Sequence, residues 1–145
     1  MLKNIANYSF NLSIEKSILD DILYRVRRSR IVNDFGNKEW KYGTEETYLK
    51  DLIEYWSNNY DWKKQEKEIN KFSHYKIEID NIPIHFIYEK GSSKNSKPLI
   101  LTHGWPWTFW DYKKIIEPLS HPEKYGGNAS DSVSYTHLRA HETLS

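Results

Sequence analysis

The chain has 145 residues, a length that fits one domain, and its 21 Lys and Arg residues nearly balance its 20 Asp and Glu residues. Because the positive and negative charges nearly cancel, the protein has no strong electrostatic field of one sign. The composition therefore disfavours nucleic acid and anionic membranes as partners. The absence of Cys excludes a disulfide framework, a thiol nucleophile and a Cys-ligated metal. The four Arg within residues 25–30 are interpreted as the basic end of a helix, with a nucleic-acid patch as the alternative.

The N-terminal residues contain no apolar run of the length that a signal peptide has. No stretch of the chain approaches the length of a membrane-spanning helix. The sequence therefore predicts a cytoplasmic protein without a membrane partner.

Helical spacing of apolar residues predicts three helices in the first half of the chain. The first follows Ser13, whose side chain suits an N-cap, and covers about residues 14–28. Thr44 is expected to cap the second helix. Asp61 is expected to cap a third helix over residues 62–72.

The apolar period changes to two after His74, which is itself expected at the surface. Residues 75–79 and 82–88 alternate apolar and polar side chains. The dipeptide Asp80-Asn81 between them is typical of a tight turn, so this segment predicts a β-hairpin.

Residues 98–101 are continuously apolar, as is typical of a strand that is covered on both faces. A helix is expected to follow, with Trp110, Ile115, Ile116 and Leu119 as its inward residues, and to end at Pro122. From about residue 131 onward Ser and Thr dominate and no period is evident. We therefore do not expect this last segment to continue the sheet.

The motif Thr102-His103-Gly104-Trp105-Pro106 directly follows the apolar strand. Gly104 permits backbone φ values that a side chain forbids, and Pro106 can lock the bend, with a cis peptide as one form. A backbone N–H fixed at such a bend can stabilise an oxyanion. Trp105 would offer this N–H, with its indole in the pocket wall. The alternative is a strand end that merely turns through Gly and Pro.

Other stretches accompany this motif in order along roughly residues 5–132. They are Phe10 to Arg30, Trp40-Lys41-Tyr42-Gly43-Thr44, Tyr55-Trp56, Tyr60-Asp61-Trp62, Ile84-His85-Phe86-Ile87 and Pro98-Leu99-Ile100-Leu101. With them, the chain resembles the N-terminal part of the microsomal and juvenile-hormone-type epoxide hydrolases. In that family position 107 usually holds a small residue, mostly Gly, whereas this chain has Trp107.

The resemblance implies an α/β fold in which a helical N-terminal segment, residues 1–73, wraps an α/β-hydrolase core that begins over residues 74–131 with the first three strands of its sheet. In such enzymes a carboxylate attacks an epoxide carbon, and a His with an acidic partner then directs water onto the resulting ester. Lid tyrosines protonate the epoxide oxygen. The implied partner is a small-molecule epoxide, without metal or organic cofactor. The implied site residues are His103, Gly104, Trp105 and Pro106, with the Trp105 N–H in the oxyanion hole.

No nucleophile elbow follows Pro106, so we expect an N-terminal fragment that is inactive alone. Residues 132–145 resemble a translated adaptor or vector sequence and are expected to be a non-native tail. His137 and His141 within it have the spacing of metal ligands, but no third ligand is evident, so no metal site is expected.

Two other interpretations stay open. The chain could be a stand-alone binding or interaction module that keeps its aromatic residues without chemistry. It could also derive from another α/β-hydrolase, such as an esterase or a dehalogenase, because His-Gly-x-Pro bends occur in several of them. The stretches Trp40 to Thr44 and Tyr60 to Trp62 favour the epoxide hydrolases, because they belong to the helical wrap and not to the shared core.

Overall fold

The computed structural model describes residues 5–138. These residues form two compact units, one of residues 5–12 with 67–138 and the other of residues 13–66. The sequence had placed the beginning of the hydrolase core at residue 74.

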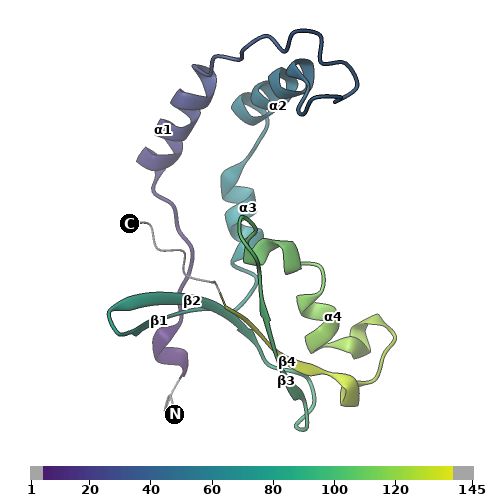
Figure 1. The fold of residues 1–145 in the computed structure, drawn as a ribbon. Coiled ribbons are helices and arrows are strands. Elements are labelled where there is room, and N and C mark those ends of the chain that lie inside the picture. Colours follow the sequence, from purple (N-terminus) through teal and green to yellow (C-terminus); the bar gives the residue numbers. More distant parts are fainter. Residues whose placement is uncertain (1–4, 139–145) are drawn as a thin grey trace. The chain divides into compact units, whose positions relative to one another are not determined.

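The first unit contains a four-stranded mixed sheet with the order β1-β2-β4-β3. The strands are β1 (His74–Ile79), β2 (Ile82–Glu89), β3 (Lys97–Thr102) and β4 (Val133–Leu138). β1, β2 and β4 pair antiparallel in turn, and β4 pairs parallel with β3 (Figure 1). The predicted combination of helices with the first strands of an α/β sheet is confirmed.

The predicted hairpin forms β1 and β2. Ile79 pairs with Ile82, so only Asp80 and Asn81 lie between the strands. Both turn residues have positive φ, at 51° and 62°. Two consecutive residues of this kind define the tight turn whose twist matches that of the strands. The local pattern alone was therefore sufficient to find this element.

The expectation that the segment after residue 131 leaves the sheet was wrong, because β4 lies between β2 and β3 in the sheet. The strand does alternate: Tyr135 and His137 are fully buried, whereas Thr136 is only half-buried. A buried His hides this alternation from a search for apolar residues. β4 falls within the predicted non-native tail, and the rest of that tail, residues 139–145 with His141, lies outside the described residues.

β3 is less covered than its composition suggests. Leu99 and Leu101 are half-buried, but Ile100 is 62% exposed. The prediction of a strand covered on both faces was therefore wrong for the described part of the chain. β3 stands at the end of the strand order, where it pairs with β4.

The single helix expected after the motif is divided into η2 (Phe109–Tyr112) and α4 (Ile116–Ser120). The reason is Pro118, which lacks an N–H and whose ring would clash with the carbonyl of Lys114 in a continuous helix. α4 ends before Pro122, as expected, and η3 (Pro122–Tyr125) and η4 (Ala129–Asp131) follow. Ile115, expected to face inward, is 40% exposed. The inward positions predicted for Ile116 and Leu119 are confirmed, because Ile116 forms the core of this unit with Ile87 and Tyr135, and Leu119 packs against it.

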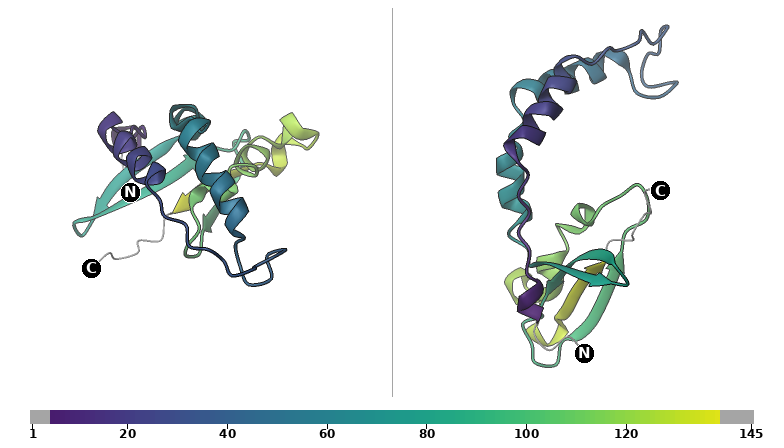
Figure 2. Two further views of the ribbon diagram at one scale, coloured as in Figure 1. Left: turned by 90° about the horizontal axis from the view of Figure 1, so that it is seen from above. Right: turned by 90° about the vertical axis from the view of Figure 1, so that its left-hand side faces the viewer.

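The second unit contains α1 (Lys16–Arg27), α2 (Glu46–Asn58) and most of α3 (Trp62–Ile69); η1 (Ile5–Tyr8) precedes it in the chain. α1 and α2 run side by side, as the views of Figures 1 and 2 agree. The apolar residues of these helices recur at helical spacing, so they lie along one face of each helix, as predicted. α3 ends three residues earlier than predicted, at Ile69.

Two of the three predicted caps were wrong. Glu15 and Glu45, not Ser13 and Thr44, precede α1 and α2, and neither forms a capping hydrogen bond through its side chain. The first N–H of α2, that of Glu46, donates instead to the carboxylate of Asp34 (3.0 Å). The Asp34 N–H donates in return to the Glu46 carboxylate. Asp61 does cap α3, because its carboxylate accepts the Lys64 N–H at 3.1 Å.

Candidate functional site

The motif after β3 forms a tight turn. The N–H of Trp107 donates to the carbonyl of Gly104 (N···O 2.9 Å), so residues 104–107 close a four-residue turn. The peptide bond between Trp105 and Pro106 is cis, which is the form that the sequence allowed for Pro106. A cis proline in the third position defines a type VI turn. The loop is therefore a defined bend of the backbone.

Gly104 does not use the conformational freedom that was expected of it. Its φ does not lie in the left-handed region, unlike those of Gly36, Gly43 and Gly126. A Cβ built at Gly104 would meet no other described atom within 4 Å. The backbone of the turn therefore does not itself require glycine at this position. The expectation that glycine supplies a φ forbidden to other residues was wrong.

The residues that follow the turn are fixed by a capping box. The hydroxyl of Thr108 accepts the Trp110 N–H at 3.2 Å. The carboxylate of Asp111 accepts the Thr108 N–H at 3.0 Å. These reciprocal bonds anchor the beginning of η2 and with it the chain that leaves the motif.

The loop borders an open concavity of about 370 Å³. The lining residues are His103, Gly104, Trp107, Asp111 and Tyr112. The Tyr112 hydroxyl donates to the Thr102 carbonyl at 3.2 Å, which connects η2 to the end of β3. Two aromatic rings and an imidazole therefore contribute to the wall.

Trp105 takes a different position from the one expected for its side chain. Its indole is 76% exposed and does not line the concavity, so the predicted wall residue was wrong. Trp107, two residues later, occupies the wall instead. Within residues 5–138 no hydrogen bond engages the Trp105 N–H. The Trp105 N–H therefore takes no part in hydrogen bonding between strands.

The predicted site residue His103 stacks on His137 of β4. The two imidazole planes are 5° apart with ring centroids separated by 5.1 Å. His103 Nδ1 lies 2.8 Å from His137 Nε2, so one of these nitrogens donates to the other. Burial lowers the pKa of His137 to about 4, and the adjacent His103 acts in the same direction. His137, the buried member of the pair, is therefore neutral at physiological pH.

A second histidine pair lies on the hairpin, and the sequence missed it. His74 is only 3% exposed, so its expected surface position was wrong. Its Nδ1 lies 2.9 Å from His85 Nε2, and its Nε2 hydrogen-bonds the carbonyl of Ile69. Both rings pack edge-on against Phe109. Burial lowers the pKa of His74, consistent with a structural role.

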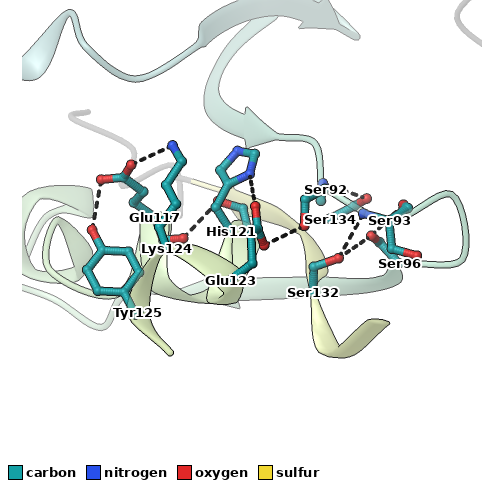
Figure 3. Close-up of polar contacts among 12 residues, drawn as sticks. Ser92, Ser93, Ser96, Glu117, His121, Glu123, Lys124, Tyr125, Ser132 and Ser134 are labelled. Atoms are coloured by element: carbon teal, nitrogen blue, oxygen red, sulfur yellow. Dashed lines mark hydrogen bonds and ion pairs between the residues drawn. The ribbon is translucent and has the colours of Figure 1, made fainter. Parts of the chain in front are cut away.

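Another group of polar side chains joins α4 to η3 and to the serine-rich loop after β2 (Figure 3). The Lys124 ammonium and the Tyr125 hydroxyl bind the Glu117 carboxylate and hold its pKa below the usual range. Ser92 donates to Glu123 at 2.8 Å. These side chains are mostly exposed and their polar atoms bind one another. The arrangement serves to fasten the crossover between β3 and β4.

Two absences concern the described residues alone. Across residues 5–138, no three His, Asp or Glu side chains converge in a way that would hold a metal ion. Nor does any helix in that range have the length and apolarity needed to cross a membrane.

Comparison with known proteins decides the family. Residues 7–112 match the family described as "Epoxide hydrolase N terminus". The chain belongs to this family. The match ends at Tyr112 and thus includes the helices of the second unit, the hairpin, β3 and the turn at residues 104–107.

One curated relative is similar in sequence, and two solved structures share the fold. The chain is 35% identical over 121 residues to "Epoxide hydrolase 1" of Sus scrofa, covering 81% of this chain and 27% of that protein. The structure of Aspergillus niger epoxide hydrolase superposes with a TM-score of 0.75 at 24% identity, over 91% of this chain and 34% of that one. For juvenile hormone epoxide hydrolase from Bombyx mori the TM-score is 0.76 at 20% identity, over 91% and 31%. The chain thus spans about a quarter to a third of the length of these proteins.

The sequence found the loop and two of the residues that line the concavity, His103 and Gly104, but not the other three. Asp111 and Tyr112 carried no expected role, and Trp107 was noted only as a departure from the usual small residue. Asp111 follows Trp107 by four residues, close to one helical turn, which was the available signal. The break between η2 and α4 in the helix expected there concealed it.

Proposed function

We propose that this chain is the N-terminal part of an epoxide hydrolase, which converts small-molecule epoxides into vicinal diols through a covalent carboxylate ester. In this proposal the turn at residues 104–107 supplies the oxyanion hole. The supporting observation is the Trp105 N–H, which has no hydrogen-bond partner within residues 5–138 and belongs to a turn that borders the concavity.

The chemistry explains why a backbone amide suits this task. When water attacks the covalent ester, the carbonyl oxygen acquires negative charge in the tetrahedral intermediate. An N–H that is already fixed in position stabilises this charge without reorganising, and one such donor is worth about 10²- to 10³-fold in rate. The hydrogen bond from Trp107 to the Gly104 carbonyl fixes the turn around that amide.

In this proposal, no residue of this chain serves as the catalytic carboxylate, the catalytic His or its acidic partner. The only Gly pair after Pro106 is Gly126-Gly127, which follows η3 and not a strand. A nucleophile elbow requires a strand, a sharp turn and a helix in succession. We therefore propose that the 145-residue chain does not open epoxides by itself. For the complete enzyme we propose a cytoplasmic location and catalysis without a cofactor.

The first experiment measures diol formation from styrene oxide by the 145-residue chain alone. We expect no rate above that of buffer. Turnover above buffer, lost on mutation of the turn, would contradict the proposed inactivity of the isolated chain.

The second experiment fuses residues 1–131 to the part of Sus scrofa epoxide hydrolase 1 that lies beyond the matched region. Hydrolysis by the fusion is expected. Trp105→Pro, which removes the N–H, should lower the rate about 10²- to 10³-fold, whereas Trp105→Phe keeps the N–H and should stay near the parent rate. Equal activity of the two variants would exclude this amide from the oxyanion hole.

A further inference from the structure

The turn at residues 104–107 lies between two members of one aromatic cluster. His103 directly precedes the turn, and Phe109 follows it at the beginning of η2. We propose that Phe109 is a positioning residue, which acts through the turn to hold the Trp105 N–H in place. This inference rests on the proposed function, in which that N–H belongs to the oxyanion hole.

The ring of Phe109 packs edge-on against three imidazoles from three strands. Its centroid lies 5.5 Å from that of His74 on β1, 5.4 Å from that of His85 on β2 and 6.4 Å from that of His137 on β4. Edge-on ring pairs are favourable beyond the area that they bury, because the edge of one ring meets the face of the other. η2 is therefore fastened to the sheet by ring contacts that an aliphatic side chain does not reproduce.

The two histidines of the hairpin are themselves fixed by a directed chain of hydrogen bonds. A carbonyl oxygen only accepts, so the His74 Nε2–H donates to the Ile69 carbonyl at 2.8 Å. Burial lowers the pKa of His74, so its other nitrogen, Nδ1, carries no proton at neutral pH and accepts the His85 Nε2–H at 2.9 Å. The hydrogen bonds therefore orient the surface against which Phe109 packs.

The same cluster reaches the other end of the turn. His137, which contacts Phe109, also shares the hydrogen bond of 2.8 Å with His103. His103 comes directly before Gly104, and Phe109 comes two residues after Trp107. The chain is therefore held before the turn and after it by two side chains that both contact His137.

Phe109 is not one of the described residues that line the concavity. It is half-buried and packs against the core formed by Ile87, Ile116 and Tyr135. A molecule in the concavity would therefore not be bound by Phe109 itself. Loss of the ring should lower kcat, because the amide is no longer held where negative charge develops, and should leave KM near the parent value.

The first test measures amide hydrogen exchange in the full 145-residue chain. The Trp107 backbone N–H closes the turn and reports on its opening. The amide of Ile87, on the strand that is paired on both sides, reports on the stability of the sheet. Phe109→Leu and Phe109→Met keep an apolar side chain and remove the ring, whereas Phe109→Tyr keeps the ring.

We expect the Trp107 N–H to exchange about tenfold faster relative to Ile87 in the two variants without a ring, because each ring pair is worth about two- to tenfold in an equilibrium constant. Phe109→Tyr should retain most of the protection. Tyr88→Leu, which removes a ring from an edge-on pair on the hairpin, should leave the ratio unchanged. Equal acceleration at Trp107 and Ile87, or no acceleration at Trp107, would overturn the positioning role.

The second test measures hydrolysis by the fusion with the porcine enzyme, with the junction moved from residue 131 to residue 138 so that β4 is retained. Phe109→Leu should lower kcat about tenfold with KM nearly unchanged, a part of the about 10²- to 10³-fold that complete loss of the donor costs. Phe109→Tyr should keep most of the rate. In the Trp105→Pro background Phe109→Leu should cost nothing further, because both substitutions act on one N–H. Losses that multiply would contradict action through the Trp105 N–H.

The outcome is separate from that of the proposed function. If Phe109→Leu opens the turn selectively while the fusion is equally active as Trp105→Pro and Trp105→Phe, Phe109 positions the turn and the oxyanion role fails. If the fusion depends on the Trp105 N–H while exchange at Trp107 in Phe109→Leu follows that at Ile87, the oxyanion role stands and the positioning role fails.

Discussion

The rings of His103 and His137 have nearly parallel planes at the junction of the motif and β4, and a hydrogen bond of 2.8 Å joins their ring nitrogens. His137 is completely buried. The Tyr135 hydroxyl lies 3.4 Å from the other nitrogen of His137, and Asp111 is the neighbouring acid. A cation on His137 would be shielded from water and adjacent to another imidazole. The structure therefore holds this residue in its neutral form.

This relationship predicts that the chain loses stability in mild acid. Burial lowers the pKa of folded His137 from 6.5 to about 4, so the unfolded chain binds the proton more readily. The free energy of unfolding should therefore fall as the pH drops below 6.5 and level off near 4, by on the order of 3 kcal/mol. Urea unfolding at several pH values, monitored by tryptophan fluorescence, measures this slope.

The matched variant is His137→Gln, which cannot take up a proton. It should be less stable than the parent chain at pH 7.5 and should show a flatter dependence between pH 6.5 and 4. His121→Gln, at an exposed ion pair with Glu123, serves as the control. An unchanged slope in His137→Gln would show that His137 does not dominate the acid response.

The histidine pairs illustrate what the sequence could and could not reveal. The hairpin followed from local alternation and from Asp80-Asn81, because both depend on neighbours in the chain. The stacking of His103 on His137 depends on a parallel pairing across 34 residues, and no local pattern encodes that distance. The same holds for the cap of α2, which Asp34 provides from twelve residues away.

The candidate site also has one part that the sequence predicted and one part that it did not. The turn of residues 104–107 could be predicted because Gly, Pro and a preceding apolar strand are local signals. The part of the wall formed by Trp107 and Tyr112 could not, because one continuous helix was expected there, whereas η2 and α4 are separate. The free space around a Cβ at Gly104 and the φ of this residue could also be known only from the structure. They contradict the expectation that Gly104 supplies a φ forbidden to other residues.

A second prediction concerns Glu66 of α3. Its carboxylate accepts the Ile14 N–H at 2.8 Å and the Trp62 indole N–H at 3.1 Å, and it pairs with Lys63. The Lys63 ammonium and the Ile14 N–H hold the pKa of Glu66 below its ordinary value of 4.5. The stabilisation is therefore present above pH 4.5 and is lost as the pH falls through the lower, folded value.

Glu66→Gln should destabilise the chain at pH 7, and the difference in unfolding free energy from the parent should shrink below pH 4.5. Thermal unfolding at pH 3 to 7 measures both effects. Glu54→Gln, at an exposed position of α2, is the matched control and should behave like the parent. A difference that persists undiminished at pH 3 would contradict an electrostatic role for Glu66.

A third prediction concerns Asn70, which holds the backbone of Leu12 with two hydrogen bonds. The Leu12 N–H donates to the Asn70 side-chain oxygen at 2.9 Å, and the side-chain nitrogen donates to the Leu12 carbonyl at 2.8 Å. Asn70→Ala leaves both backbone groups without this partner, which should cost about 1–3 kcal/mol. Urea unfolding gives the cost, and amide hydrogen exchange at Leu12 should accelerate.

The control for Asn70 is Asn58→Ala at the exposed end of α2. A surface substitution of this kind should stay within about 0.5 kcal/mol of the parent. If Asn70→Ala were equally mild and Leu12 exchange unchanged, the paired hydrogen bonds would not fix this segment.

The last prediction separates stability from function at Gly104. Because its φ is compatible with a side chain and a Cβ would meet nothing within 4 Å, Gly104→Ala should raise the free energy of unfolding by about 0.4–1 kcal/mol through the unfolded chain. The added methyl occupies a position that lines the concavity. We therefore expect the fusion with the porcine enzyme to lose activity although the variant is more stable.

The contrasting variant is Gly91→Ala. A Cβ at Gly91 would lie 2.2 Å from the Ser96 hydroxyl oxygen and 2.9 Å from the Val133 carbonyl oxygen. Overpacking of this kind costs about 1–3 kcal/mol, so Gly91→Ala should be destabilised while Gly104→Ala is not. Loss of stability in Gly104→Ala, measured by urea unfolding, would show that the motif needs glycine for folding and would remove the argument that the open space serves a ligand.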